Sequence, residues 1–142
     1  MNRGSRRAAQ IAAAALAALV VVATVEALLP RKDWYAPPAF GAFRVVVGDF
    51  SRWDKVVHGY LGFSATLLGT LALLLGRGWT LRRSTRVAWL FVAGWALLVE
   101  TAQGFLAHRN AELFDFFAAL LGGALVVVTS WFATRLWGGS GG

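Results

Sequence analysis

The sequence has 142 residues, of which 58% are hydrophobic and only 15% are charged. Water-soluble domains are usually about 45–50% apolar and about 25% charged, so this composition excludes an ordinary soluble domain. The absence of cysteine excludes disulfides and thiolate ligands. The net charge of +7 comes from 14 basic and 7 acidic residues.

Four stretches with few charges are long enough to cross a membrane as helices. They are residues 8–29, 56–75, 87–106 and 116–134. Each has about 20 residues, the length with which an α-helix covers about 30 Å of hydrocarbon. A lone strand cannot span lipid because its backbone groups would stay unpaired. The sequence therefore predicts an all-α fold, with residues 1–142 forming one polytopic membrane domain, a bundle of four transmembrane helices.

The first span allows a second interpretation. Arg3, Arg6 and Arg7 precede an Ala-rich run, which also fits a cleavable signal peptide. The run is long and lacks a clear small-x-small cleavage site before Pro30, so we favour a retained helix. Cleavage would leave the orientation of the other three helices unchanged.

The longest connection, residues 30–55, contains three prolines and several scattered apolar residues among glycines and charges. It is too short and too polar to cross the membrane. We therefore expect an interfacial or re-entrant segment on the outer face of the membrane.

Basic residues are concentrated in alternate connections. The N-terminus, residues 76–86 and the C-terminus carry Arg3, Arg6, Arg7, Arg77, Arg82, Arg83, Arg86 and Arg135, and no acidic residue. Because short cytoplasmic segments are enriched in Lys and Arg, this pattern predicts that both termini are cytoplasmic. The charge therefore indicates membrane orientation, and no nucleic-acid partner is expected because the sequence shows no basic groove or stacking platform.

Small residues follow polar ones at helical spacing in two spans. Gly62, Ala65, Gly69 and Ala72 follow His58, and Ala118, Ala119 and Gly122 follow Asp115. Steps of three and four residues place each set on one helix face. Such faces let membrane helices approach closely, so His58 and Asp115 should face neighbouring helices.

Seven polar residues are expected to meet near the outer face of this bundle. They are Asp54, Lys55, His58, Glu100, Gln103, Arg109 and Asp115. The predicted topology brings the span ends that carry them to one side. Glu100 lies roughly 20 Å into its span, counted from the cytoplasmic end. An ionised group at that depth needs a partner on a neighbouring helix, and ionisable residues inside spans are functional candidates.

The spacing of these residues resembles the VanZ-like family of bacterial membrane proteins. That family has Asp-Lys with His three residues after the Lys, then Glu-x-x-Gln on a later helix. Arg follows six residues after the Gln, Asp six after the Arg, and Gly seven further on. The matching residues, within 54–126, are Asp54, Lys55, His58, Glu100, Gln103, Arg109, Asp115 and Gly122. The sequence departs from the family at Gly62 and Ala119, where an aromatic residue and an Asn are common.

The resemblance implies a VanZ-like domain in the bacterial cytoplasmic (inner) membrane, acting on the cell envelope at the outer leaflet. The family's founding member is associated with low-level resistance to the lipoglycopeptide teicoplanin. A similar antibiotic-resistance role is therefore an expectation here. The expected partners are membrane lipids and an anionic lipid-linked envelope precursor or a lipoglycopeptide.

Three interpretations of the seven polar residues remain open. In a binding site, Lys55 and Arg109 would contact a phosphate or carboxylate of an envelope lipid or lipoglycopeptide. In a membrane-embedded enzyme, His58 and a carboxylate would form a general base, with Arg109 stabilising charge. In a structural network, the side chains would only hold the helices together. Ion or proton passage is disfavoured because the polar residues stop at one side.

No cofactor and no metal site are predicted. His58, Glu100 and Asp115 could ligate a metal ion, but one His with two acids at unrelated spacings is a weak ligand set. His108 and Glu112 are interpreted as ordinary residues of a solvated loop.

Overall fold

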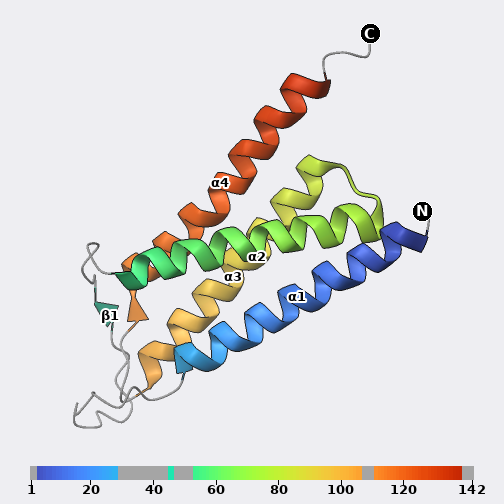
Figure 1. The fold of residues 1–142 in the computed structure, drawn as a ribbon. Helices are drawn as coiled ribbons and strands as arrows, with labels where there is room; N and C mark the ends of the chain where they lie inside the picture. Colours follow the sequence, from blue (N-terminus) through green and yellow to red (C-terminus); the bar gives the residue numbers. More distant parts are fainter. Residues whose placement is uncertain (1–2, 29–44, 47–52, 107–110, 139–142) are drawn as a thin grey trace.

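The computed structural model describes residues 3–28, 45–46, 53–106 and 111–138, which form four long helices and two very short strands (Figure 1). The helices are α1 (Arg3–Leu28), α2 (Trp53–Arg77), α3 (Leu81–Phe105) and α4 (Leu113–Gly138). The strands are β1 (Val45–Val46) and β2 (Ala111–Glu112). The predicted all-helical fold is confirmed. Each helix starts a few residues before its predicted span, because charged side chains at helix ends lower hydropathy without interrupting a helix.

All four helices are long and apolar enough to cross a membrane. Their outward faces carry large apolar side chains, such as Leu98 and Leu136, which are 68% and 75% exposed. An extended apolar surface of this kind is rare on soluble monomers and marks contact with lipid or with another protein. Length, composition and surface therefore fit a multi-pass membrane protein.

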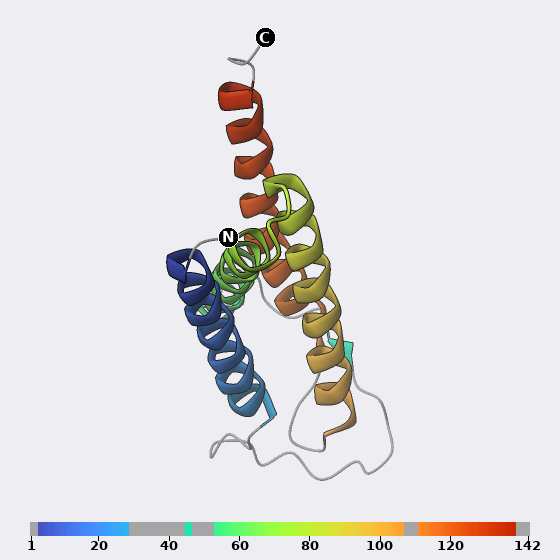
Figure 2. The ribbon, with the colours of Figure 1, turned by 90° about the vertical axis from the view of Figure 1, so that its right-hand side faces the viewer.

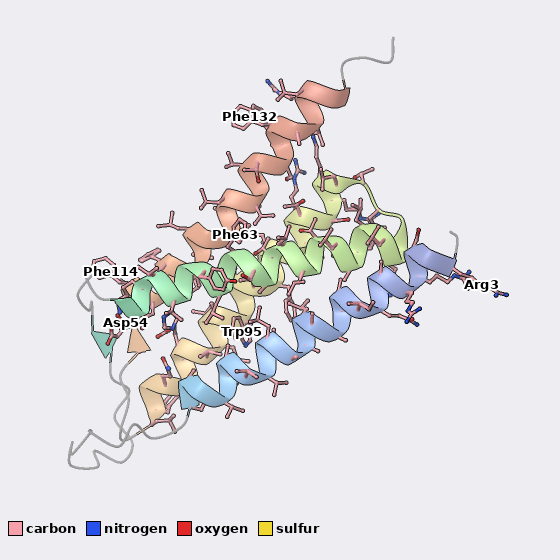
Figure 3. All side chains as sticks on the ribbon, in the orientation of Figure 1. Arg3, Asp54, Phe63, Trp95, Phe114 and Phe132 are labelled. Atoms are coloured by element: carbon pink, nitrogen blue, oxygen red, sulfur yellow. The ribbon has the colours of Figure 1, made fainter. Side chains whose placement is uncertain are left out.

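Helix α2 lies at the centre of the bundle and packs against the other three helices. Successive helices run in opposite directions, and the C-terminal part of α4 extends beyond the rest (Figures 1 and 2). The ends of α1 and α3 and the starts of α2 and α4 consequently share one end of the bundle. Figure 3 shows Asp54 at this end and Arg3 at the far end of α1.

The small faces predicted on α2 and α4 are in direct contact. A Cβ atom added to Gly62 would lie 2.0 Å from the carbonyl oxygen of Ala119. One added to Gly122 would lie 1.8 Å from the carbonyl oxygen of Gly59. Both distances are far below van der Waals contact, so only glycine permits this crossing. The crossing fixes the relative position of the first turns of α2 and α4, which precede these glycines. These two turns carry most of the polar residues.

Hydrogen bonds from two tryptophans connect the other helices. Trp95 Nε1 of α3 donates to Thr24 Oγ1 of α1 over 3.0 Å, and Trp89 Nε1 donates to the carbonyl oxygen of Leu120 in α4 over 3.1 Å. The N-terminus of α3 is capped by Thr80, whose side chain accepts from the backbone N–H of Arg83. These contacts orient α3 between α1 and α4.

The two strands form a parallel pair in which Val45 aligns with Ala111 and Val46 with Glu112. Strand β2 runs directly into α4, so the pair holds the chain in place immediately before that helix. Of the predicted interfacial segment, residues 30–55, the structure describes only the two residues of β1 and residues 53–55, which belong to the first turn of α2. The rest of the segment lies outside the described residues.

Candidate functional site

Lys55 lies at the centre of a group of ionisable side chains at the shared end of the bundle. Lys55 is 3% exposed, and its ammonium forms ion pairs with Asp115 of α4 and Glu112 of β2. A third carboxylate, that of Asp54, lies 3.4 Å away. One buried cation therefore joins the start of α2 to the segment that leads into α4.

His58 follows Lys55 by one helical turn and is oriented by the backbone. Its Nδ1 atom lies 2.8 Å from the carbonyl oxygen of Asp54 and 3.8 Å from Oδ1 of Asp115. A carbonyl oxygen only accepts, so Nδ1 carries the hydrogen and donates. In the neutral ring, Nε2 then keeps a free electron pair.

Glu100 reaches the same region from α3. It is 7% exposed, and its Oε2 accepts a hydrogen bond of 2.9 Å from the backbone N–H of Glu112. Through this bond, the buried carboxylate of Glu100 near the end of α3 holds β2 in position. The predicted convergence is therefore seen for Asp54, Lys55, His58, Glu100 and Asp115, together with the additional residue Glu112. We call these six residues the Lys55 cluster.

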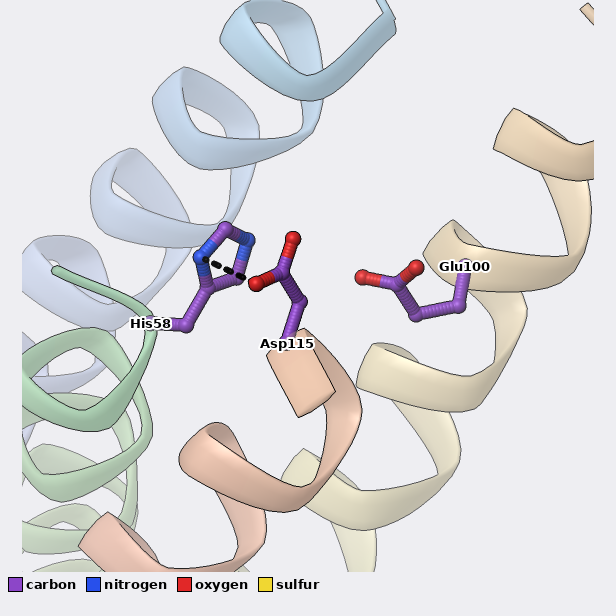
Figure 4. Close-up of side chains that lie close together, drawn as sticks. All are labelled: His58, Glu100 and Asp115. Atoms are coloured by element: carbon purple, nitrogen blue, oxygen red, sulfur yellow. Dashed lines mark ion pairs between the residues drawn. The ribbon is translucent and has the colours of Figure 1, made fainter. Parts of the chain in front are cut away.

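Three members of the Lys55 cluster line a small cavity. Figure 4 shows the carboxylate of Asp115 between the imidazole of His58 and the carboxylate of Glu100. These side chains, with Trp95 and several aliphatic residues, enclose about 30 Å³. One ligand atom from each of the three polar residues lies within 4.8 Å of the other two. Asp54, Glu112 and Asp115 satisfy the same criterion, but they surround the ammonium of Lys55.

The interpretation of Glu112 as an ordinary loop residue is wrong. It belongs to β2, its side chain is 22% exposed, and it pairs with Lys55. The strand pairing and the turn into α4 aim this side chain at α2. The available sequence signal was its position three residues before Asp115, a spacing that allows both carboxylates to reach one cation.

Gln103 makes its side-chain hydrogen bond to α1 and not to a member of the Lys55 cluster. It is 5% exposed, and its Nε2 donates a hydrogen bond of 2.9 Å to the carbonyl oxygen of Ala27 in the last turn of α1. Carbonyl groups in the last turn of a helix have no partner within the helix, so this contact satisfies one and ties α1 to α3. Arg109 lies outside the described residues.

We expect Gln103→Leu to destabilise the bundle slightly without affecting the Lys55 cluster. Loss of one interhelical hydrogen bond should lower the free energy of unfolding by about 1 kcal/mol. Thermal unfolding in detergent measures this. The control is Thr101→Val, because the exposed Thr101 hydroxyl bonds only within α3, to the carbonyl oxygen of Leu97, in the contacts described. Unchanged stability in Gln103→Leu would contradict a tethering role.

Charge in the Lys55 cluster is strongly unbalanced. Four carboxylates, from Asp54, Glu100, Glu112 and Asp115, face the single ammonium of Lys55. Carboxylates at this density in a poorly hydrated site require compensation by protons or by further cations. Without such compensation, the Lys55 cluster carries a net negative charge.

Comparisons of the chain with family models, curated proteins and solved structures found no match.

Proposed function

We propose that the chain is a VanZ-like protein of the bacterial cytoplasmic membrane. In this proposal it binds or modulates an anionic envelope lipid or a lipoglycopeptide target at the Lys55 cluster. The observation that carries the proposal is the meeting of ionisable side chains from α2, α3, β2 and α4 at one end of an otherwise apolar bundle. Ionisable residues in such helices are expensive to bury and usually serve a function.

The helices do not need these charges in order to associate. α2 and α4 already cross in backbone contact at Gly62 and Gly122, and two tryptophan hydrogen bonds join α3 to its neighbours. Hydrogen bonds between membrane helices each contribute on average under about 1 kcal/mol. A purely structural network would therefore be an inefficient use of six ionisable residues.

The proposed orientation follows from the basic residues. Arg3, Arg6 and Arg7 begin α1 at the end of the bundle where α2 and α3 connect, opposite the Lys55 cluster (Figure 3). The last residue of α2 is Arg77, and the start of α3 carries Arg82, Arg83 and Arg86. Because Lys and Arg favour the cytoplasmic side, both termini would be cytoplasmic and the Lys55 cluster would lie near the outer leaflet.

An anionic ligand needs a cation that the protein's own acids do not neutralise. Lys55 already pairs with Asp115 and Glu112. We therefore assign the direct contact to Arg109, whose guanidinium can bond two oxygens of a phosphate or carboxylate at once. Lys55 would then act by holding the carboxylates in place.

A membrane-embedded enzyme is the second candidate. The proximity of His58, Glu100 and Asp115 favours it, since a carboxylate beside an imidazole can assist a general base. The chemical composition of lipid-linked species in cell extracts distinguishes the two functions. An enzyme changes these species when the chain is expressed, whereas a binding protein leaves them unchanged and retains affinity for its ligand.

The test is expression of single variants in a bacterial host, with two measurements for each variant. Arg109→Gln, Glu100→Gln and His58→Leu are scored for folded yield in detergent and for susceptibility to teicoplanin. The wild-type chain is expected to lower susceptibility, and all three variants should lose this effect while keeping their yield. Thr101→Val, one residue from Glu100 on the exposed side of α3, is the matched control and should behave like the wild type.

Two outcomes would contradict the binding proposal. If yield and the resistance effect fall together in every variant, the Lys55 cluster acts as a scaffold. If the variants keep both, the cluster has no part in the function.

A further inference from the structure

We propose that His58, Glu100 and Asp115 form a binding site for one divalent metal ion of the Zn²⁺ or Mn²⁺ type. These residues come from three different helices, α2, α3 and α4, and all three line the same cavity (Figure 4). Their separation in sequence made them a weak ligand set, but the fold brings their donor atoms together.

The geometry is close to that of a metal site. One donor atom from each of the three side chains lies within 4.8 Å of the other two. Donor atoms about 2.1 Å from a tetrahedral Zn²⁺ are roughly 3.4 Å apart. Closure around an ion would therefore need side-chain movements of about an ångström. The cavity of about 30 Å³ exceeds the roughly 10–15 Å³ that one water molecule needs, so it has room for a small ion.

The hydrogen bond of His58 prepares the ring for this role. Its Nδ1–H donates to the carbonyl oxygen of Asp54, so Nε2 is the nitrogen with an electron pair for a metal. Imidazoles that bind metals usually donate their other N–H to a backbone carbonyl or carboxylate, which fixes the ring orientation. Glu100 is held comparably, by the backbone N–H of Glu112.

Charge also favours a divalent cation. The Lys55 cluster contains four carboxylates and one ammonium, and a dication would remove most of the excess negative charge. The alternative acidic group, Asp54 with Glu112 and Asp115, already surrounds Lys55, and a second cation there would meet the ammonium directly. The group that contains His58 is the one with a nitrogen ligand and a cavity.

A metal at this site would give the proposed anionic ligand a position to bind. This role of the metal rests on the proposed function. Three protein ligands leave a position open for water or for an oxygen of an incoming ligand. A phosphate or carboxylate on an envelope lipid could occupy that position, although the surrounding carboxylates alone would repel it. The metal site itself can be tested without any lipid.

The experiment measures binding of Zn²⁺ alone to the full chain, purified in detergent micelles and stripped of metal. Competition with a chromogenic chelator gives the affinity, and elemental analysis gives the stoichiometry. We expect one ion per chain in the wild type. Glu100→Gln, which is nearly isosteric, and His58→Leu should each weaken binding at least about tenfold. His108→Gln, the control at the other histidine in the sequence, should leave binding unchanged.

A spectroscopic measurement avoids dependence on variants that fail to fold. Mn²⁺ bound to the unmodified chain should show coupling to a single imidazole nitrogen in pulsed electron paramagnetic resonance. The coupling should persist in His108→Gln. Absence of stoichiometric binding, equal affinity in all variants, or loss of coupling in His108→Gln would each overturn the metal site.

The results also separate this inference from the proposed function. If the chain lowers teicoplanin susceptibility but binds neither Zn²⁺ nor Mn²⁺, the metal site is wrong and the envelope role stands. If it binds one ion through His58 and Glu100 but has no effect on susceptibility, the metal site stands and the envelope role is wrong.

Discussion

Gly122→Ala is expected to destabilise the bundle severely, although it adds only one methyl group. That Cβ would lie 1.8 Å from the carbonyl oxygen of Gly59 and 3.0 Å from the backbone nitrogen of Phe63. Backbone atoms cannot rotate away as a side chain can, so α2 and α4 would have to separate along their contact. We expect a loss of about 3 kcal/mol or more in the free energy of unfolding. Thermal unfolding in detergent and the yield of monodisperse protein measure it.

Gly94→Ala is the matched control for this change. Gly94 lies in the middle of α3, and a Cβ added there meets no atom within 4 Å. Alanine is favoured over glycine inside a helix by about 1 kcal/mol, so this variant should be as stable as the wild type or slightly more stable. If the two variants were equally stable, the close crossing of α2 and α4 would be incorrect.

The small-residue faces of α2 and α4 are the part of the packing that could be predicted from residue types alone. Small residues at steps of three and four mark a helix face that can approach another backbone, and the faces behind His58 and Asp115 do meet. Sequence periodicity identifies such faces but does not assign partners among four helices. The central position of α2 and the divergence of α4 therefore required the structure.

The candidate site was predictable where residues lie on helices of known direction. Lys55 and Asp115 lie in the first turns of α2 and α4, which run in the same direction and begin at the same end of the bundle, so their meeting follows from the topology. Glu112 was missed because it precedes α4 in a strand, and hydropathy carries no information on a two-residue pairing with β1. Gln103 shares a helix face with Glu100, yet it bonds to Ala27 in α1, whereas Glu100 bonds to Glu112 in β2. The same face of α3 therefore contacts two neighbours.

The close approach of the three proposed metal ligands could not be predicted from the sequence for a different reason. Spacing rules identify ligands when two of them share one helix or loop. His58, Glu100 and Asp115 lie on three helices, so their donor atoms approach only through the tertiary packing. The backbone hydrogen bonds that orient His58 and Glu100 likewise depend on the folded chain.

Lys55→Met is expected to be the most damaging single substitution in the Lys55 cluster. Lys55 is 3% exposed and pairs with Asp115 and Glu112, so removing the ammonium leaves buried carboxylates facing one another without a cation. Loss of one partner from a buried ion pair costs about 3–5 kcal/mol, mainly through the charge left behind. The measured quantity is the midpoint of thermal unfolding in detergent. Arg86→Met, which removes an exposed cation from α3 at the opposite end, should shift the midpoint little.

The origin of this loss can be tested by neutralising the acids as well. If the unpaired carboxylates cause the destabilisation, the triple variant Lys55→Met, Glu112→Gln, Asp115→Asn should be more stable than Lys55→Met alone, since uncharged polar groups cost less to bury than charges. Supplying Zn²⁺ to Lys55→Met should also recover stability, because the His58, Glu100 and Asp115 ligands remain and ligand binding favours the folded state. A triple variant no more stable than Lys55→Met would show that the lysine contributes through packing of its methylene chain. The carboxylates would then be balanced in some way other than by Lys55.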